Sequence, residues 1–201
     1  MTLMKKIVFY IIISVSFLYP QNISVDNNKD FEKALSYYNS KNYENALNLF
    51  QKIFNRPENN TKATASAFFI SKILVEQKKF SDAEKSINDF LIKHSQSKYA
   101  DEIKKLLIKN YLDKNDYQGA FSTSLKFIES SKSIVFKKES KSIADKIAVN
   151  YLNNSDMERY LEDYNDSSLK SFLLLLSGKI YLNEGEKIEA IKKFTEITTK
   201  H

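Results

Sequence analysis

The chain has 201 residues, of which 42% are hydrophobic, 3 are glycine, 2 are proline and none is cysteine. This length allows one domain with a continuous core, and the shortage of turn-forming residues favours an all-α protein over a turn-rich β fold. Without cysteine, and with two histidines far apart, the chain offers no thiolate nucleophile and no paired metal-ligand spacing. Its net charge of +6 is spread over interleaved acids and bases, which argues against nucleic-acid binding.

The first twenty residues differ from the rest of the chain. Lys5-Lys6 precede an uncharged apolar run from Ile7 to Leu18, which is the pattern of an export signal. The run is short for a helix that must cross a hydrocarbon core of ~30 Å. We therefore expect residues 1–21 to be an export signal, with a short uncleaved anchor as the alternative and the only route to a membrane, and residues 22–26 to be a linker.

From Asn27 onward the hydrophobic periodicity is helical. Apolar residues from Phe31 to Tyr38 follow the i, i+3, i+4, i+7 spacing, which resumes from Ala46 to Phe54 after a short polar break. Later helices are predicted at about 62–77, 81–93, 99–112, 116–129, 134–152 and 156–164. Ser81 and Asp116 stand where a side-chain oxygen could cap the second helix of a pair.

An aromatic residue followed three positions later by alanine recurs every 37 residues. The three occurrences are Tyr43-Glu44-Asn45-Ala46, Phe80-Ser81-Asp82-Ala83 and Tyr117-Gln118-Gly119-Ala120. A fixed period of this length is typical of a solenoid, in which each repeat buries its apolar face against its neighbours. The sequence therefore predicts a stack of helix pairs.

These residues resemble the tetratricopeptide repeat (TPR) family. Its packing signature has a small residue at position 8, aromatic residues at 11 and 17, alanine at 20 and bulky apolar residues at 24 and 27. The first repeat fills all six places with Ala34, Tyr37, Tyr43, Ala46, Phe50 and Ile53. A last repeat supplies Gly178, Tyr181, Ala190, Phe194 and Ile197, with Lys187 as its one mismatch. The resemblance implies a TPR-like α-α superhelix over residues 27–201, a solenoid of antiparallel helix hairpins with about five repeats, the fourth degenerate.

The same residues are expected to be packing residues. Small side chains lie where the two helices of a hairpin cross, and the aromatic side chains fill the space beside them. An aromatic stripe at helical spacing is usually core, so we assign the Tyr and Phe of the first three repeats and of the last repeat, Phe54 included, to the interior.

The link from Phe90 to Glu102 resembles that of repeat proteins of the bacterial cell envelope. These include the lipoprotein of the outer-membrane β-barrel assembly machine and the repeat-containing partner of the Tol-Pal system. Proline is common in them where this chain has Ser95. Together with the export signal, this resemblance implies an exported envelope protein, in the periplasm or secreted.

In the TPR family, positions 2, 5, 9, 12 and 13 of each repeat line a concave groove that binds peptides. The resemblance implies the following groove residues: Phe31, Leu35, Tyr38, Asn39, Phe68, Lys72, Val75, Glu76, Glu102, Lys105, Lys109, Leu112, Asp113, Leu175, Lys179, Leu182 and Asn183. Lys72, Lys105, Lys109 and Lys179 could form a basic ladder that receives an acidic peptide or a terminal carboxylate. The alternative is a set of solvated lysines on a lysine-rich surface.

Enzyme motifs are missing from the sequence. Gly119, Gly178 and Gly185 cannot form a dinucleotide or phosphate loop, and there is no nucleophile elbow. We therefore expect no catalytic, cofactor-binding or metal-binding residues, and interpret the chain as an exported scaffold that binds envelope proteins or peptides. The alternative is a structural or oligomerisation region, or the N-terminal part of a larger envelope assembly protein. It rests on the last repeat, which reaches Thr198 with no capping helix after it.

Overall fold

The computed structural model describes residues 27–56 and 62–199. The predicted export signal or anchor (1–21) and linker (22–26) lie outside the described residues, as do residues 200–201 at the end of the predicted array. The described part contains ten α-helices and no strand. They are α2 (Asn27–Asn39), α3 (Tyr43–Phe54), α4 (Ala63–Glu76), α5 (Phe80–Lys93), α6 (Ala100–Asp113), α7 (Tyr117–Ser130), α8 (Ile134–Tyr151), α9 (Asn154–Asp163), α10 (Lys170–Asn183) and α11 (Lys187–Thr199). None of these helices is both long enough and apolar enough to cross a bilayer.

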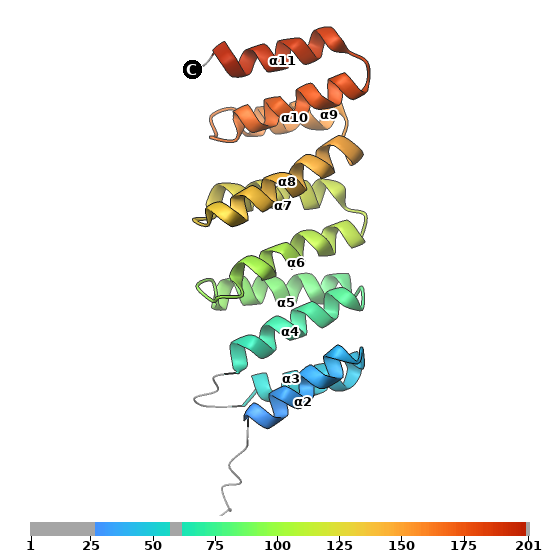
Figure 1. The fold of residues 1–201 in the computed structure, drawn as a ribbon, viewed down its shortest axis with the longest axis vertical. Helices are drawn as coiled ribbons and strands as arrows, with labels where there is room; N and C mark the ends of the chain where they lie inside the picture. Colours follow the sequence, from blue (N-terminus) through green and yellow to red (C-terminus); the bar gives the residue numbers. More distant parts are fainter. Residues whose placement is uncertain (1–26, 57–61, 200–201) are drawn as a thin grey trace, which may run out of the picture.

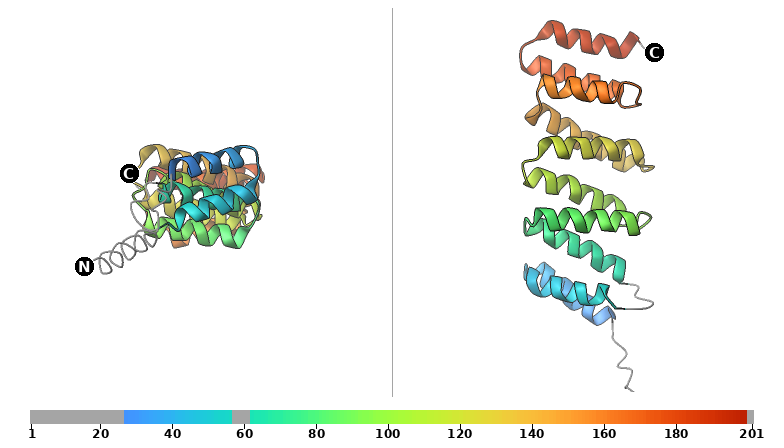
Figure 2. Two further views of the ribbon diagram at one scale, coloured as in Figure 1. Left: turned by 90° about the horizontal axis from the view of Figure 1, so that it is seen from below. Right: turned by 180° about the vertical axis from the view of Figure 1, so that it is seen from behind.

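The helices form antiparallel hairpins stacked along one axis (Figure 1). Helices α2, α4, α6, α8 and α10 make a front layer, and α3, α5, α7 and α9 lie behind them, with α11 at the end of the stack. Figure 2 shows the back layer from behind. Helices that follow one another in the chain pack together, with the exception of α8 and α9, and α4 with α6 and α8 with α10 also contact within the front layer. The fold is the all-α, TPR-like solenoid that the sequence predicts.

Most of the hairpins turn in the same way. In four hairpins the second residue after the first helix has a positive φ: Lys41 (59°), Lys78 (56°), Asn115 (63°) and Gly185 (84°). In the first turn the Lys41 N–H donates to the Tyr38 carbonyl and the Asn42 N–H to the Tyr37 carbonyl, both at 2.9 Å, and the other three turns repeat this pair of bonds. This is a Schellman cap, which satisfies the last carbonyls of the helix and reverses the chain.

The hairpin of α8 and α9 departs from this pattern. Leu152 and Asn153 are extended, and Asn153 forms a capping box with Asp156 at the start of α9. Helix α9 therefore begins at Asn154, inside the segment that the sequence predicted as a turn. Here a capped extended link replaces the left-handed turn, which agrees with a degenerate fourth repeat.

The repeated alanines are the crossing points of the hairpins, as predicted. Ala46, Ala83, Ala120 and Ala190 are all fully buried. The core runs along the stack as three successive clusters of buried side chains. Phe54 is the exception among the aromatic residues assigned to the core: it lies at the end of α3 and is 36% exposed, so that assignment was wrong.

One of the two predicted caps is confirmed. The Asp116 side chain accepts a hydrogen bond from the Gly119 N–H at 2.8 Å, at the N-terminus of α7. The Ser81 cap was wrong, because α5 already begins at Phe80 and its N-cap is Lys79, which makes no side-chain cap bond. Ser81 thus lies within the first turn of the helix.

Candidate functional site

The front layer carries the residues that the family resemblance assigns to a groove. Leu35, Tyr38, Lys72, Lys105 and Leu112 are half-buried, and Glu76, Lys109 and Leu182 are exposed. Phe31, Phe68 and Val75 must be corrected, because all three are buried in the core, with exposures of 7%, 9% and 1%, and contribute little to a groove surface. Val75 is only 1% exposed, since α4 packs against α3, α5 and α6 at once.

The predicted basic ladder is largely neutralised. The Lys105 Nζ lies 2.5 Å from Glu102 and 3.2 Å from Glu139, and the hydrogen bond to Glu102 is the main reason that the pKa of Lys105 is raised. Lys109 pairs with Asp113 at 2.5 Å. Each of these cations already has a carboxylate, so neither is free for an acidic peptide.

Two of the ion pairs join successive helices of the front layer. Lys105 on α6 reaches Glu139 on α8 at 3.2 Å, and Lys179 on α10 reaches Asp145 on α8 at 2.6 Å. These lysines therefore connect neighbouring repeats. Through them, α8 is connected to both α6 and α10.

Lys72 is the member of the ladder with no carboxylate among the described residues. Its Nζ lies 5.2 Å from the ring centroid of Tyr38, 5.9 Å from that of Phe68 and 6.0 Å from that of Phe69. These distances are typical of cation–π contacts. The rings thus replace a carboxylate as the partner of this ammonium group.

The front layer is hollowed between α8 and α10. This front cleft has a volume of about 300 Å³ and is lined by Asp145, Lys146, Val149, Asn150, Lys179, Leu182 and Asn183. Leu182 is 47% exposed there, and Leu175, two turns earlier on α10, is exposed as well. The cleft combines apolar side chains with two exposed amides and is walled by the Lys179–Asp145 ion pair.

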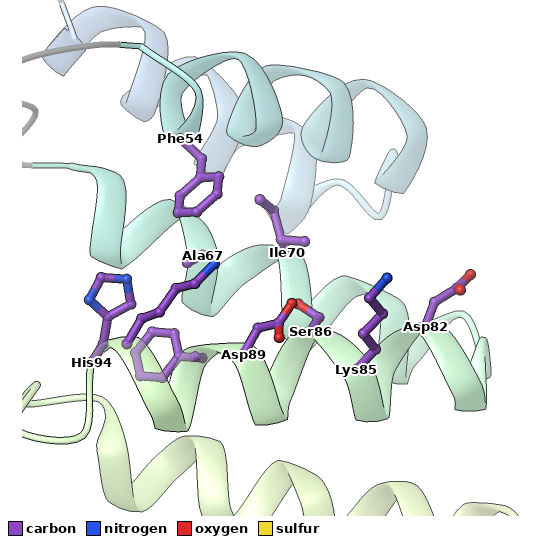
Figure 3. Close-up of a pocket in the computed structure, with 10 residues that line it drawn as sticks. Phe54, Ala67, Ile70, Asp82, Lys85, Ser86, Asp89 and His94 are labelled. Carbon is purple, nitrogen blue, oxygen red and sulfur yellow. The ribbon is translucent and has the colours of Figure 1, made fainter.

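A second cleft lies on the back layer and was missed by sequence reasoning (Figure 3). This back cleft has a volume of about 280 Å³ and lies between α3 and α5, with α4 behind it. Phe54, Ala67, Ile70 and Phe90 supply its apolar lining. Its rim on α5 carries Asp82, Lys85, Asp89 and Lys93, with Ser86 and His94. The interleaved acids and bases of α5 were the available signal, but in the sequence we used such interleaving only as an argument against nucleic-acid binding.

No catalytic constellation is evident in the described part of the chain. There, no group of three or more His, Asp or Glu side chains is placed to hold a metal ion. The raised pKa values belong mainly to tyrosines such as Tyr111 and Tyr160, where burial is the main cause. These shifts follow from packing between helices, and neither tyrosine lines the front or the back cleft.

Comparison with known proteins assigns neither a family nor a function. No protein-family model matches the chain, and no curated protein does so. A solved structure described as the crystal structure of MamA is similar to it, with 15% sequence identity and a TM-score of 0.49, over 83% of this chain and 93% of that chain. At this identity the likeness says nothing about a partner or an activity.

Proposed function

We propose that the chain is an exported, non-catalytic scaffold that binds proteins or peptides of the bacterial envelope in the front cleft. The observation that carries this proposal is the exposure of Leu182, 47%, in a cleft flanked by the amides of Asn150 and Asn183. An exposed apolar side chain with polar groups around it is typical of the surfaces that proteins use to contact one another.

The chemistry of the front cleft favours an extended segment with an apolar side chain. Leu182 and Val149 offer an apolar contact, and each asparagine amide can both donate to and accept from a peptide backbone. The volume of about 300 Å³ is at the lower end of the range for binding pockets. An acidic partner gains little support, because the lysine beside the cleft, Lys179, already pairs with Asp145.

Leu182→Asp tests the site. The variant places a charge in the front cleft, while Ile134→Asp changes a side chain that is 83% exposed at the start of α8, away from the cleft lining. Binding partners captured from envelope extract with the full chain should be lost with Leu182→Asp and retained with Ile134→Asp. Equal capture by both variants would contradict the site.

Export rests on the N-terminal sequence and needs its own test. Lys5-Lys6 and the apolar run that follows support passage across the inner membrane. Fractionation of cells that express the full chain should place it in the periplasm or the medium. N-terminal sequencing would then distinguish a cleaved signal near residue 21 from an uncleaved anchor. Recovery only from the cytoplasm would exclude export.

A structural or oligomerisation role is the second candidate. It is favoured by Ile188 and Ile191, two exposed isoleucines one turn apart on α11. If this face joins the chain to another copy, Ile188→Lys with Ile191→Lys should convert an oligomer to a monomer in sedimentation experiments. An oligomer that persists in this variant must use a different surface.

A further inference from the structure

The charged rim of the back cleft has no partners within the described chain. Asp82, Lys85, Asp89 and Lys93 follow one another along α5 at spacings of three or four residues, with alternating sign. Within the described residues they form no ion pair, although Lys85 and Asp89 stand four residues apart, a spacing that allows one. Figure 3 shows Asp82, Lys85 and Asp89 side by side along α5, facing the cleft. The front-layer lysines Lys105, Lys109 and Lys179, in contrast, are paired.

Along α5 these four charges run negative, positive, negative, positive. In the reverse direction each sign is exchanged, so two antiparallel copies of the row place opposite charges face to face. Asp82 and Lys93 lie at nearly equal distances from a point near residue 87, and Lys85 and Asp89 lie on either side of the same point. A second α5 that runs in the opposite direction would therefore place Lys93 opposite Asp82 and Asp89 opposite Lys85. The midpoints of the two pairings differ by less than one residue, so a single two-fold axis relates both. Each ion pair therefore forms twice, once on either side of the axis, as a symmetric dimer interface requires.

We propose that the back face of α5 is a dimer interface, which pairs antiparallel with α5 of a second copy of this chain. A parallel pairing in register would bring like charges together, which is unfavourable, so the charge order selects the orientation. The other exposed side chains of α5 are Ser81, Asn88 and Ile92, none of which is charged. No like-charge contact between the two helices opposes the antiparallel pairing.

Apolar groups beside the charged row add to the surface that a second copy could cover. Ile92 flanks the row and is 79% exposed, and Phe54 borders the back cleft with 36% of its surface exposed. A neighbouring α5 would shield the ion pairs from water and strengthen their attraction. The front cleft lies on the opposite layer, so the dimer leaves it open in both copies. The inference therefore does not depend on the proposed function.

A charge-swap experiment tests this pairing. The acidic variant carries Lys85→Glu and Lys93→Glu, and the basic variant carries Asp82→Lys and Asp89→Lys, both in the full chain. All four side chains line the cleft rim or are exposed, so far-ultraviolet circular dichroism should show unchanged helix content. In sedimentation at about 100 µM, the wild type should be dimeric. Each variant alone should have a dimer dissociation constant at least about tenfold higher, because like charges then face each other. An equimolar mixture of the two variants should form the mixed dimer.

Salt and a matched control complete the test. Raising the salt concentration should weaken the wild-type dimer, because surface ion pairs are screened. Lys126→Glu with Lys138→Glu makes the same charge change at exposed lysines outside the back cleft and should leave the dimer intact. A wild-type monomer at about 100 µM, or a mixture of the two variants that stays as monomeric as each alone, would overturn the proposal. A dimer lost on changing Ile188 and Ile191 but retained in the acidic variant would overturn it as well.

Discussion

The ring of Phe194 occupies the space beside Gly178, where the last two helices cross. A Cβ built on Gly178 would lie 2.2 Å from Cε1 of this ring, far closer than two carbon atoms can approach. Both residues were predicted as packing residues of the last repeat. The contact explains why α10 has a glycine in mid-helix, where glycine is otherwise unfavourable.

Gly178→Ala should therefore destabilise the protein. Alanine is the better helix former by about 1 kcal/mol, but overpacking of a buried crossing costs about 1–3 kcal/mol. We expect a net loss of about 1 kcal/mol in the free energy of unfolding, measured by urea denaturation. Phe194→Leu should partly reverse the effect of Gly178→Ala. A Gly178→Ala variant more stable than wild type would show that the ring moves aside without cost.

The two predicted helix caps form a matched pair for substitution. Asp116→Ala removes a hydrogen bond of 2.8 Å to the Gly119 N–H and should cost about 1 kcal/mol of stability. Ser81→Ala should change stability by less than about 0.5 kcal/mol, because Ser81 caps nothing and is exposed. Equal effects in chemical denaturation would mean that the cap of α7 contributes little.

Tyr111 should make stability depend on pH at the alkaline end. Burial, together with the hydrogen bond that its hydroxyl donates to Glu84 at 2.6 Å, raises the pKa of Tyr111 to about 12 from an ordinary value of 10.0. The unfolded chain loses this proton first, so the contribution of Tyr111 is complete below pH 10 and is lost as pH rises toward 12.

The variant Tyr111→Phe checks this pH dependence. It should lower the free energy of unfolding by about 1 kcal/mol at neutral pH, because the hydrogen bond to Glu84 is lost. It should also reduce the loss of stability between pH 10 and 12, followed by urea denaturation at each pH. If the free energy of unfolding falls as steeply between pH 10 and 12 in Tyr111→Phe as in the wild type, other tyrosines cause the loss.

The ion pair between Lys179 and Asp145 should contribute modestly to repeat packing. Its atoms are 2.6 Å apart, but both side chains are more than a third exposed. A double-mutant cycle with Lys179→Ala and Asp145→Ala should give a coupling energy of about 0.2–1 kcal/mol, which falls at high salt. A coupling energy that does not change with salt would indicate a contact that is not mainly electrostatic.

The packing of the array could be predicted from sequence because it repeats locally. Alanine at 46, 83, 120 and 190 must lie where two neighbouring helices cross, and this depends only on spacing within one hairpin. The boundary of α5 could not be read in the same way. The N-cap is Lys79 and not Ser81, and only the turn that precedes the helix decides which residue takes that position.

The surfaces were harder to predict because they depend on contacts between repeats. Lys105 meets Glu139, and Lys179 meets Asp145, across 34 residues of sequence, so the neutralisation of the ladder is not visible in one repeat. Val75 fits a groove position of the family, yet neighbouring helices bury it. The back cleft depends on the space between α3 and α5, which no motif encodes.

The left-handed turns allow the stability of single hairpins to be changed without altering the front or the back cleft. Lys41 and Lys78 have φ values of 59° and 56°, a conformation that costs a side-chain-bearing residue about 1–2 kcal/mol and that glycine adopts freely. The stability of a repeat array is approximately the sum of the stabilities of its repeats and of the interfaces between neighbours. Removing the backbone strain in one turn therefore stabilises mainly the hairpin that contains it. The substitution Lys41→Gly or Lys78→Gly should therefore change which hairpin unfolds first when the protein is heated or pulled. These turns are positions at which the order of unfolding along the array can be engineered.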